Sequence, residues 1–249
     1  MYQKERIENI MKILEENGYV TVKYLTGKLH YSTATINRDL NVMESMQMAV
    51  RSYGGVEIPK ASPIPLQFRY HKEEPVKRKI AKAAADFICD GDTVYIDGST
   101  TSEYIGNFIA GKKNITVITN NMALVEKLTE KGIYVVCTGG TVCDPPYILG
   151  GPDAVRTALR YNTDKLFFSA YGVSDSGKIF VTTQTHSTLD DAAMKNAKKV
   201  YFLIDRSKIN METKYITADF SEVDTVISNY KFPDATKAVY KNTGFIEVE

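Results

Sequence analysis

Apolar positions predict three short helices near the start of the chain. In the first, apolar residues lie three and four positions apart, which is helical spacing, and Gly18 ends it. The second is predicted over 21–29 with Thr21 as its N-cap, and the third follows the N-cap Ser32 after a turn at His30 and Tyr31. The inward-facing residues are Ile7, Ile10, Met11 and Leu14, then Val22, Leu25 and Leu29, then Ile36, Leu40 and Met43. Two short helices joined by a tight turn are typical of a helix-turn-helix unit.

The third helix carries small, amide and guanidinium side chains away from its apolar face, while Asp39 lies near the apolar edge. The residues predicted to face DNA there are Ser32, Thr33, Ala34, Thr35, Asn37, Arg38 and Asn41. In the major groove an amide pairs with adenine, a guanidinium with guanine or phosphate, and a methyl group with thymine. The pattern favours a helix that binds DNA, and the alternative is a module that binds another protein.

A β-hairpin is predicted after the third helix, over residues 48–58. The segment has a strand, a Gly-Gly turn at Gly54 and Gly55, and a second apolar stretch. We expect Arg51 and Tyr53 of this wing to contact the phosphate backbone.

A proline-rich segment separates this unit from the rest of the chain. Four of the eight prolines, Pro59, Pro63, Pro65 and Pro75, fall within it, and each disfavours helix in the residue before it. We therefore expect a winged helix-turn-helix domain over 1–57, an extended linker over 58–75 and a larger domain over 76–249.

Strand and helix signals alternate through the larger domain, which predicts an open parallel α/β sheet. An amphipathic helix with apolar residues from Ile80 to Ile88 comes first. The predicted strands are Thr93–Ile96, Ile115–Ile118, Ile133–Cys137, Leu166–Ala170, Val200–Ile204 and Thr225–Ile227.

Polar loops follow four of these strands, at the sheet edge where ligands of such folds bind. A Gly permits close backbone approach, helix-initial amides attract an anion, and Lys208 adds a positive charge. The candidate ligand-binding residues are Asp97, Gly98, Ser99, Thr100, Thr101, Thr119, Asn120, Asn121, Gly139, Gly140, Asp205 and Lys208. This set suits a phosphorylated polyol or sugar, and the alternative is that the loops are only turns with helix caps.

Composition excludes several classes of protein. Lys and Arg total 31 against 30 for Asp and Glu, so the net charge is +1 and bulk charge does not argue for DNA binding. No apolar run is long enough to span a membrane and no signal peptide is recognised, so we expect a cytoplasmic protein with no membrane partner. Three cysteines without a Cys-x-x-Cys pair and three scattered histidines predict reduced thiols, no metal and no cofactor. Gly106–Lys112 matches a phosphate-binding loop only in part, because Lys113 stands where Ser or Thr is required.

Residues 19–56 resemble the winged helix-turn-helix of DeoR-type bacterial transcriptional regulators. The matching residues are Ser32, Thr35, Ile36, Arg38, Asp39, Leu40, Arg51, Gly54 and Gly55. Asn37 stands where the family usually has Arg, and Tyr53 where it usually has His.

The polar loops resemble the sensor domain of the same family, which is similar to ribose-phosphate isomerases and glucosamine-phosphate deaminases. The matching segments are Asp97–Thr100, Thr119–Asn120, Gly139–Gly140, Asp164–Phe167 and Asp205–Lys208. His186 and Asp190 depart from it, because relatives commonly have a Glu and a basic residue there.

The resemblance implies a regulator, and not an enzyme. It would be a repressor of sugar or carbohydrate metabolism genes that binds double-stranded operator DNA as a homo-oligomer, dimer or tetramer. A phosphorylated sugar or related metabolite would control its operator affinity. The alternative is a sugar-phosphate isomerase or deaminase-like enzyme with an N-terminal helical module, in which Asp97, Asp205 or His186 would supply a general base.

Overall fold

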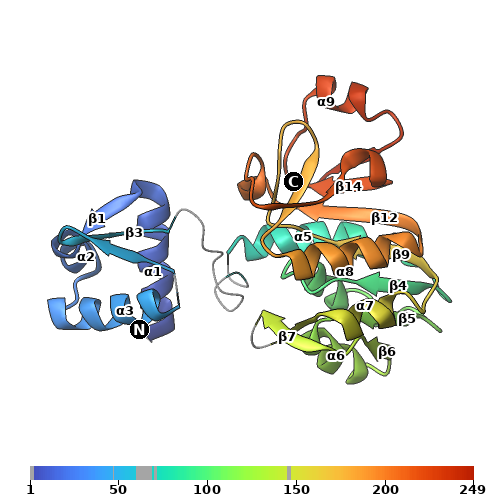
Figure 1. Cartoon of the computed structure of the whole chain (residues 1–249), viewed down its shortest axis with the longest axis horizontal. Coiled ribbons are helices and arrows are strands. Elements are labelled where there is room, and N and C mark those ends of the chain that lie inside the picture. The colour runs from blue at the N-terminus through green and yellow to red at the C-terminus, as the bar shows by residue number, and fades with distance from the viewer. Residues whose placement is uncertain (1–2, 47, 60–68, 70–71, 145–146) are drawn as a thin grey trace. The chain divides into compact units, whose positions relative to one another are not determined.

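The computed structural model describes residues 3–46, 48–59, 69, 72–144 and 147–249 (Figure 1). The chain divides into two compact units, Met1–Arg69 and Tyr70–Glu249. Most of the segment predicted as a linker, 60–68 and 70–71 with Pro63 and Pro65, lies outside the described residues. The helix α5 (Glu74–Ala85) begins within that segment, because Pro75 occupies its first turn, where the missing N–H of proline costs nothing.

The N-terminal unit contains the three predicted helices. They are α1 (Gln3–Asn17), α2 (Val22–Leu29) and α3 (Thr33–Ser45). The predicted N-caps are confirmed, because Thr21 accepts a bond from the backbone of Tyr24 and Ser32 accepts one from Thr35. The predicted apolar residues form one buried core, with Leu25, Ile36, Leu40 and Met43 fully buried.

A three-stranded antiparallel sheet completes this unit. Its strands are β1 (Tyr19–Thr21), β2 (Val50–Ser52) and β3 (Gly55–Glu57), in the order β1-β3-β2. The hairpin is confirmed, but its turn residues are Tyr53 and Gly54 and not Gly54 and Gly55. Both turn residues have positive φ, 40° and 79°, whereas Gly55 pairs with Ser52 in the sheet. The three-residue β1 was not predicted, since it is too short to show an alternating pattern.

The C-terminal unit is built on a parallel seven-stranded sheet in the order β15-β14-β12-β9-β4-β5-β6. The strands are β4 (Thr93–Ile96), β5 (Thr116–Thr119), β6 (Tyr134–Cys137), β9 (Thr163–Phe168), β12 (Ala197–Ile204), β14 (Thr225–Ser228) and β15 (Gly244–Glu247). Every pair in this sheet is parallel. The predicted fold class and six of these strands are therefore confirmed, with ends shifted by up to three residues.

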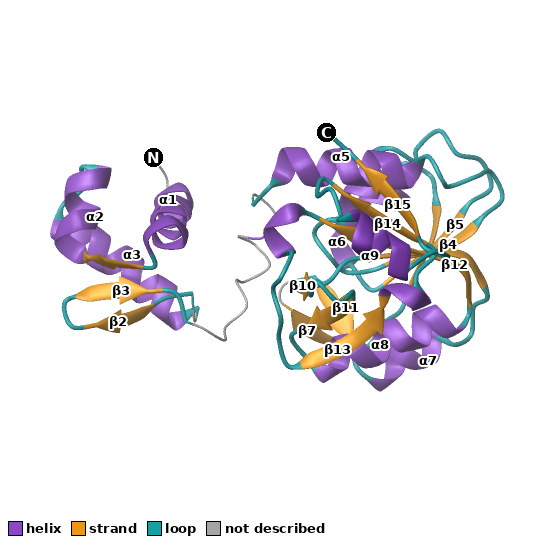
Figure 2. Cartoon of the chain, turned by 90° about the horizontal axis from the view of Figure 1, so that it is seen from above, coloured by secondary structure: helices purple, strands orange, loops and turns teal. Residues whose placement is uncertain are grey.

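Helices cover both faces of the sheet, which gives three layers (Figure 2). On one face α5 (Glu74–Ala85) and α6 (Met122–Thr129) pack against a buried cluster. On the other, α7 (Pro152–Ala158) and α8 (Gln184–Lys195) pack against a second cluster. Successive strand residues alternate between the clusters, as Phe167 and Phe168 do, which explains why these strands are apolar throughout.

Short antiparallel additions surround the main sheet. One small sheet has β10 (Gly172–Val173), β11 (Lys178–Val181) and β13 (Tyr215–Asp219), and another has β7 (Thr141–Asp144) and β8 (Ile148–Gly150). A short helix, α9 (Asp234–Val239), precedes β15. The first predicted helix of this unit ends earlier than expected, at Ala85, so Phe87 and Ile88 lie beyond it.

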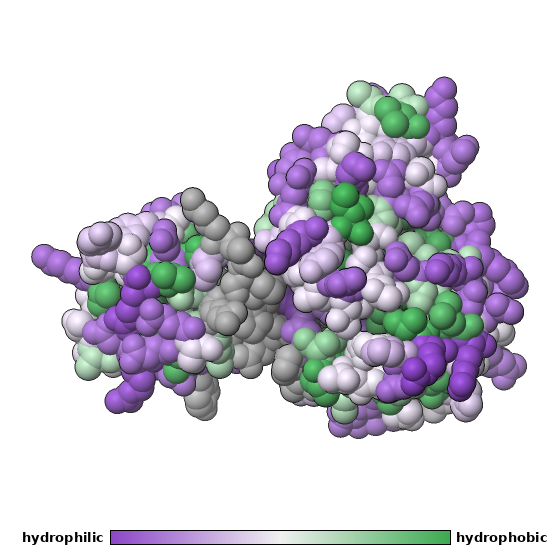
Figure 3. Space-filling model, in the orientation of Figure 1, coloured by the Kyte–Doolittle hydropathy of each residue, from purple (hydrophilic) through white to green (hydrophobic). Residues whose placement is uncertain are grey.

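On the face seen in Figure 3, apolar residues are scattered among polar ones in each unit. Cys89, Cys137 and Cys143 are free thiols on the surface. Among the described helices, none combines the length and apolar character needed to cross a membrane.

Candidate functional site

The structure places the predicted DNA-facing residues of α3 at the surface. Ser32, Thr33, Ala34, Arg38 and Asn41 are exposed, and Thr35 and Asn37 are half-buried. The Ser32 hydroxyl caps the helix and also lies 2.9 Å from the Thr35 hydroxyl. The N-terminal turns of α3 therefore present short polar groups on a fixed backbone.

Asp39 is buried below this surface rather than at its edge. Its side chain is fully buried and accepts bonds from Arg6 Nε at 2.7 Å, Arg6 Nη2 at 2.9 Å and Gln3 Nε2 at 3.1 Å. The hydrogen bond from Arg6 to Asp39 raises the pKa of the guanidinium above its ordinary value. Asp39 is thus a structural residue that fixes α1 against α3.

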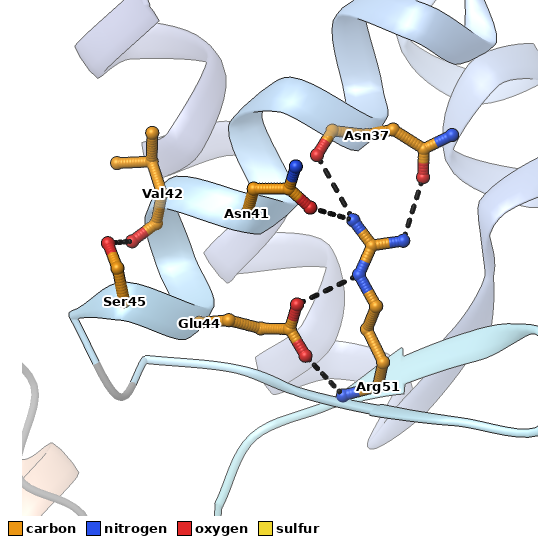
Figure 4. Close-up of polar contacts among 6 residues, drawn as sticks. All are labelled: Asn37, Asn41, Val42, Glu44, Ser45 and Arg51. Atoms are coloured by element: carbon orange, nitrogen blue, oxygen red, sulfur yellow. Dashed lines mark hydrogen bonds and ion pairs between the residues drawn. The ribbon is translucent and has the colours of Figure 1, made fainter.

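The two predicted wing residues lie in different settings. Tyr53 is fully exposed at the tip of the hairpin. Arg51 turns back onto α3, where its guanidinium bonds to Asn37, Asn41 and Glu44 (Figure 4). The sequence did not indicate these contacts, because they join residues 7 to 14 positions apart across two elements.

The predicted ligand-binding loops all follow the carboxyl ends of parallel strands, so they lie along one edge of the main sheet. Asp97 follows β4 and is buried there. Its Oδ1 accepts a bond from Ser99 Oγ at 2.8 Å, and its Oδ2 accepts one from the Ser169 backbone at 3.2 Å. Burial raises the pKa of this carboxyl above its usual range. The loop then enters a 3₁₀ helix at Ser102–Asn107, where an ordinary helix was expected.

Two buried polar atoms of these loops lack a hydrogen-bond partner among the described residues. They are the Thr101 hydroxyl and the Asn120 amide oxygen, and both side chains are nearly inaccessible to solvent. Buried polar groups are almost always bonded, so these two atoms are candidates for a hydrogen bond with water or with a ligand. Asn121 differs, because its Oδ1 caps α6 and its Nδ2 bonds to Glu103.

The glycines of the site meet different constraints. A Cβ on Gly98 would lie 2.8 Å from the Ile148 side chain, so this loop packs closely against β8. Gly139 and Gly140 both have positive φ, 69° and 104°. A Cβ on Gly140 would lie 2.3 Å from the Gly150 carbonyl oxygen, whereas one on Gly139 would meet open space.

Two lysines bring positive charge to this edge of the sheet. Lys208 donates to the Ala170 carbonyl at 2.9 Å and to Ser169 Oγ at 3.4 Å, while Asp205 caps the turn that carries it. Lys77 of α5 is only 2% exposed and donates to Thr100 Oγ1 at 3.1 Å. The sequence did not single out Lys77, because its place beside Thr100 depends on how α5 packs.

His186 and Asp190, the two residues that depart from the expected sensor-domain pattern, both lie on α8. Asp190 Oδ2 accepts a bond from Thr217 at 3.1 Å, and His186 Nε2 lies 3.8 Å from Cys143 Sγ. Burial, and then the nearby charge of Asp97, raise the pKa of Asp190 well above its ordinary value. The same two carboxylates add to the effect of burial in raising the pKa of Tyr95. An acidic side chain of α8 therefore stands close to Asp97.

Comparison with known proteins identifies the class. The DeoR C-terminal sensor domain matches residues 72–230, and the DeoR-like helix-turn-helix domain matches residues 6–62. The chain belongs to the DeoR family of transcriptional regulators, whose members are not enzymes.

Individual relatives match along nearly their whole length. The HTH-type transcriptional repressor GlcR of Bacillus subtilis is 30% identical over 92% of this chain and 89% of its own. The glycerol-3-phosphate regulon repressor of Escherichia coli is 24% identical over 92% of each chain. Among solved structures, ribose 5-phosphate isomerase A of Methanocaldococcus jannaschii covers 55% of each chain at 19% identity, with a TM-score of 0.41.

Proposed function

We propose that this protein is a repressor of carbohydrate metabolism genes whose operator affinity is controlled by a phosphorylated sugar or related metabolite. Residues 1–57 would read double-stranded DNA, 58–75 would join the domains and 76–249 would sense the effector. The observation that carries the proposal is the exposed polar face of α3, with the wing folded beside it. A helix and a hairpin in this arrangement suit contact with a major groove and its flanking phosphates, which supports the proposal.

The effector site is proposed at the carboxyl edge of the main sheet. The loops there combine the unpaired Thr101 hydroxyl and Asn120 oxygen with the cation of Lys208. A phosphate would pair with the positive charge of Lys208 and sugar hydroxyls would bond to the two polar atoms, which supports a phosphorylated sugar. One relative, the glycerol-3-phosphate regulon repressor, has a phosphorylated polyol in its name, which supports the same class of ligand.

Two further properties follow from this function. A protein that reads repeated half-sites must present repeated readers, so we propose a homo-oligomer, a dimer or tetramer. A DNA-binding regulator acts where the genome is, so we propose a cytoplasmic location.

A binding titration tests the DNA-binding role. The full chain is titrated against the duplex upstream of its own gene and against random duplex at about 0.15 M salt. We expect a preference for the upstream duplex that Arg38→Ala abolishes, because Arg38 is an exposed guanidinium on the reading face. Equal affinity of the wild type for both duplexes would reject the proposed function. Robust turnover of ribose or amino-sugar phosphates would instead favour an enzyme.

A further inference from the structure

Arg51 connects the wing to the reading face of α3. Its Nη1 donates to Asn37 Oδ1 at 2.8 Å, and its Nη2 donates to Asn41 Oδ1 at 2.6 Å and to the Asn37 carbonyl at 3.1 Å. Asn37 and Asn41 lie four positions apart on α3, so both face the same side of the helix. One guanidinium thus holds two side chains that are placed to meet bases.

Glu44 holds Arg51 in this position. Its Oε2 accepts a bond from Arg51 Nε at 2.9 Å, and its Oε1 accepts one from the Arg51 backbone at 3.2 Å. The carboxylate therefore bonds to both the backbone and the guanidinium of Arg51, and it balances the charge of that guanidinium. For this reason Arg51 is poorly suited to the phosphate contact that the sequence suggested.

The chemistry of the guanidinium decides which way the two amides point. A guanidinium has N–H donors and no acceptor, so only the oxygen of an asparagine amide can face it. A flipped amide would place N–H groups against N–H groups. The oxygens of Asn37 and Asn41 are directed at Arg51, and their amino groups point away from it (Figure 4).

We propose that Arg51 is a positioning residue for base selection, which presents Asn37 and Asn41 to DNA as hydrogen-bond donors. Guanine offers two acceptors in the major groove, whereas cytosine offers only an amino donor. An unrestrained asparagine can rotate its amide and accept from cytosine, but one held by Arg51 cannot do so without losing that bond. This inference rests on the proposed DNA-binding function and deepens it, because it names the base edges that the helix selects.

The test compares base selection by the full-length wild type, Arg51→Ala and Glu44→Ala. Each protein selects duplexes from a random library, and the chosen duplex is then titrated with guanine replaced by cytosine at each position. At positions read by Asn37 or Asn41 we expect the wild type to prefer guanine by about ten-fold. We expect the preference to fall to about two-fold or less in both variants, because Arg51→Ala removes the guanidinium that holds the amides and Glu44→Ala removes the carboxylate that anchors this guanidinium.

The two variants separate this effect from a change in charge. Arg51→Ala removes a positive charge and Glu44→Ala removes a negative one, so their effects on overall affinity should have opposite signs. Lys28→Ala is the matched control, because Lys28 is an exposed cation of α2 outside these contacts. It should weaken binding to all sequences and keep the guanine preference.

The outcomes are distinguishable. An unchanged preference in both variants, or a wild type that selects cytosine, overturns the role of Arg51 and leaves the proposed function standing. A wild type without any sequence preference overturns the proposed function. If Arg51→Ala fails to fold, Glu44→Ala decides the question, since it keeps Arg51 and only removes the group that anchors it.

Discussion

Asp39 shows how a single residue can have a role that its neighbours do not suggest. It lies in the middle of the helix predicted to read DNA, next to the exposed Arg38, yet its carboxylate is fully buried. The helix period explains the contrast, because a step of one residue rotates the side chain by about 100° and turns it toward α1. There Arg6 and Gln3 supply its hydrogen bonds.

Replacing this carboxylate should destabilise the N-terminal unit. Asp39→Ala removes the carboxylate that accepts bonds from Arg6 and Gln3, and we expect a loss of about 2 kcal/mol. Hydrogen exchange in the full chain measures the loss, on the α3 amides for Asp39→Ala and on the α7 amides for the control. Asp153→Ala is the control, because its ion pair with Arg156 is exposed, and it should cost below about 1 kcal/mol. Equal costs would show that burial of Asp39 contributes little.

Asp190 should make the stability of the C-terminal unit depend on pH. Its folded-state pKa is raised well above the ordinary value by burial and by Asp97, so the folded unit favours the protonated carboxyl. The stabilisation is fully present below the unfolded pKa of about 3.9 and is lost as pH rises through the folded pKa. We therefore expect the advantage of Asp190→Asn over the wild type to grow from pH 5 to pH 8.

Urea denaturation of the full chain at the two pH values measures this difference. The advantage of Asp97→Asn over the wild type should also grow from pH 5 to pH 8, because burial raises the pKa of Asp97 as well. Asp175→Asn, at an exposed position of the same unit, is the control. An advantage of Asp190→Asn that shrinks from pH 5 to pH 8 would contradict the electrostatic account.

At the scale of elements, a strand could be predicted where its residues are apolar without interruption. The central strands, such as Val94–Ile96 within β4, meet this condition because both of their faces are covered. The edge strand β15 contains Gly244 and Glu247, and β1 has only three residues, so neither stood out. The hairpin of β7 and β8 was not predicted either, because its strands have only four and three residues.

The residues of the candidate site that could be predicted are those that come directly after a strand. Asp97 and Asn120 could be found because each comes directly after an apolar run that ends at the same sheet edge. Lys77 could not be found, because its position beside Thr100 results from the packing of α5. The contacts of Arg51 are similar, since they depend on how the wing folds against α3.

Gly139 and Gly140 come directly before β7, and their conformations lead to a prediction about the stability of the hairpin formed by β7 and β8. Gly140→Ala should cost more stability than Gly139→Ala, because its Cβ would lie 2.3 Å from the backbone oxygen of Gly150 at the end of β8. We expect about 1 kcal/mol for Gly139→Ala, from its positive φ alone. Gly140→Ala should cost at least about 3 kcal/mol, because β7 and β8 must also separate.

Thermal denaturation of the two full-length variants compares these costs. The shared positive φ makes Gly139→Ala the matched control for Gly140→Ala, so the difference between them reports the contact with Gly150. Similar melting temperatures for the two variants would show that β7 and β8 can separate without a loss of stability.

At the scale of the whole molecule, the nearly balanced charge gives DNA binding little help from electrostatic attraction. The net charge is +1, and over residues 1–55 seven basic residues stand against six acidic ones. Part of that positive charge is also neutralised within the unit, because Arg6 pairs with Asp39 and Arg51 with Glu44. Binding must therefore depend on specific contacts of α3, and a pair of such units in an oligomer would strengthen it.

Lys208 allows sensing to be separated from DNA binding. An effector can alter operator affinity only if it binds two conformations unequally, and the operator must then alter effector affinity by the same factor. Lys208 is the candidate phosphate ligand at the sheet edge, far along the chain from the DNA-facing residues of α3. Lys208→Ala should therefore keep operator affinity within about two-fold and lose effector-induced release, which we expect to be about ten-fold or more in the wild type.

The measurement titrates operator duplex with and without the sugar phosphate that most raises the melting temperature of the wild type. Lys198→Ala is the matched control, because Lys198 is an exposed cation of the same unit that bonds to Asp164 outside the site. It should respond to the effector as the wild type does. Equal release in Lys208→Ala and the wild type would show that Lys208 does not hold the phosphate. Loss of operator binding in Lys208→Ala with an unchanged melting temperature would show instead that the two functions share this residue.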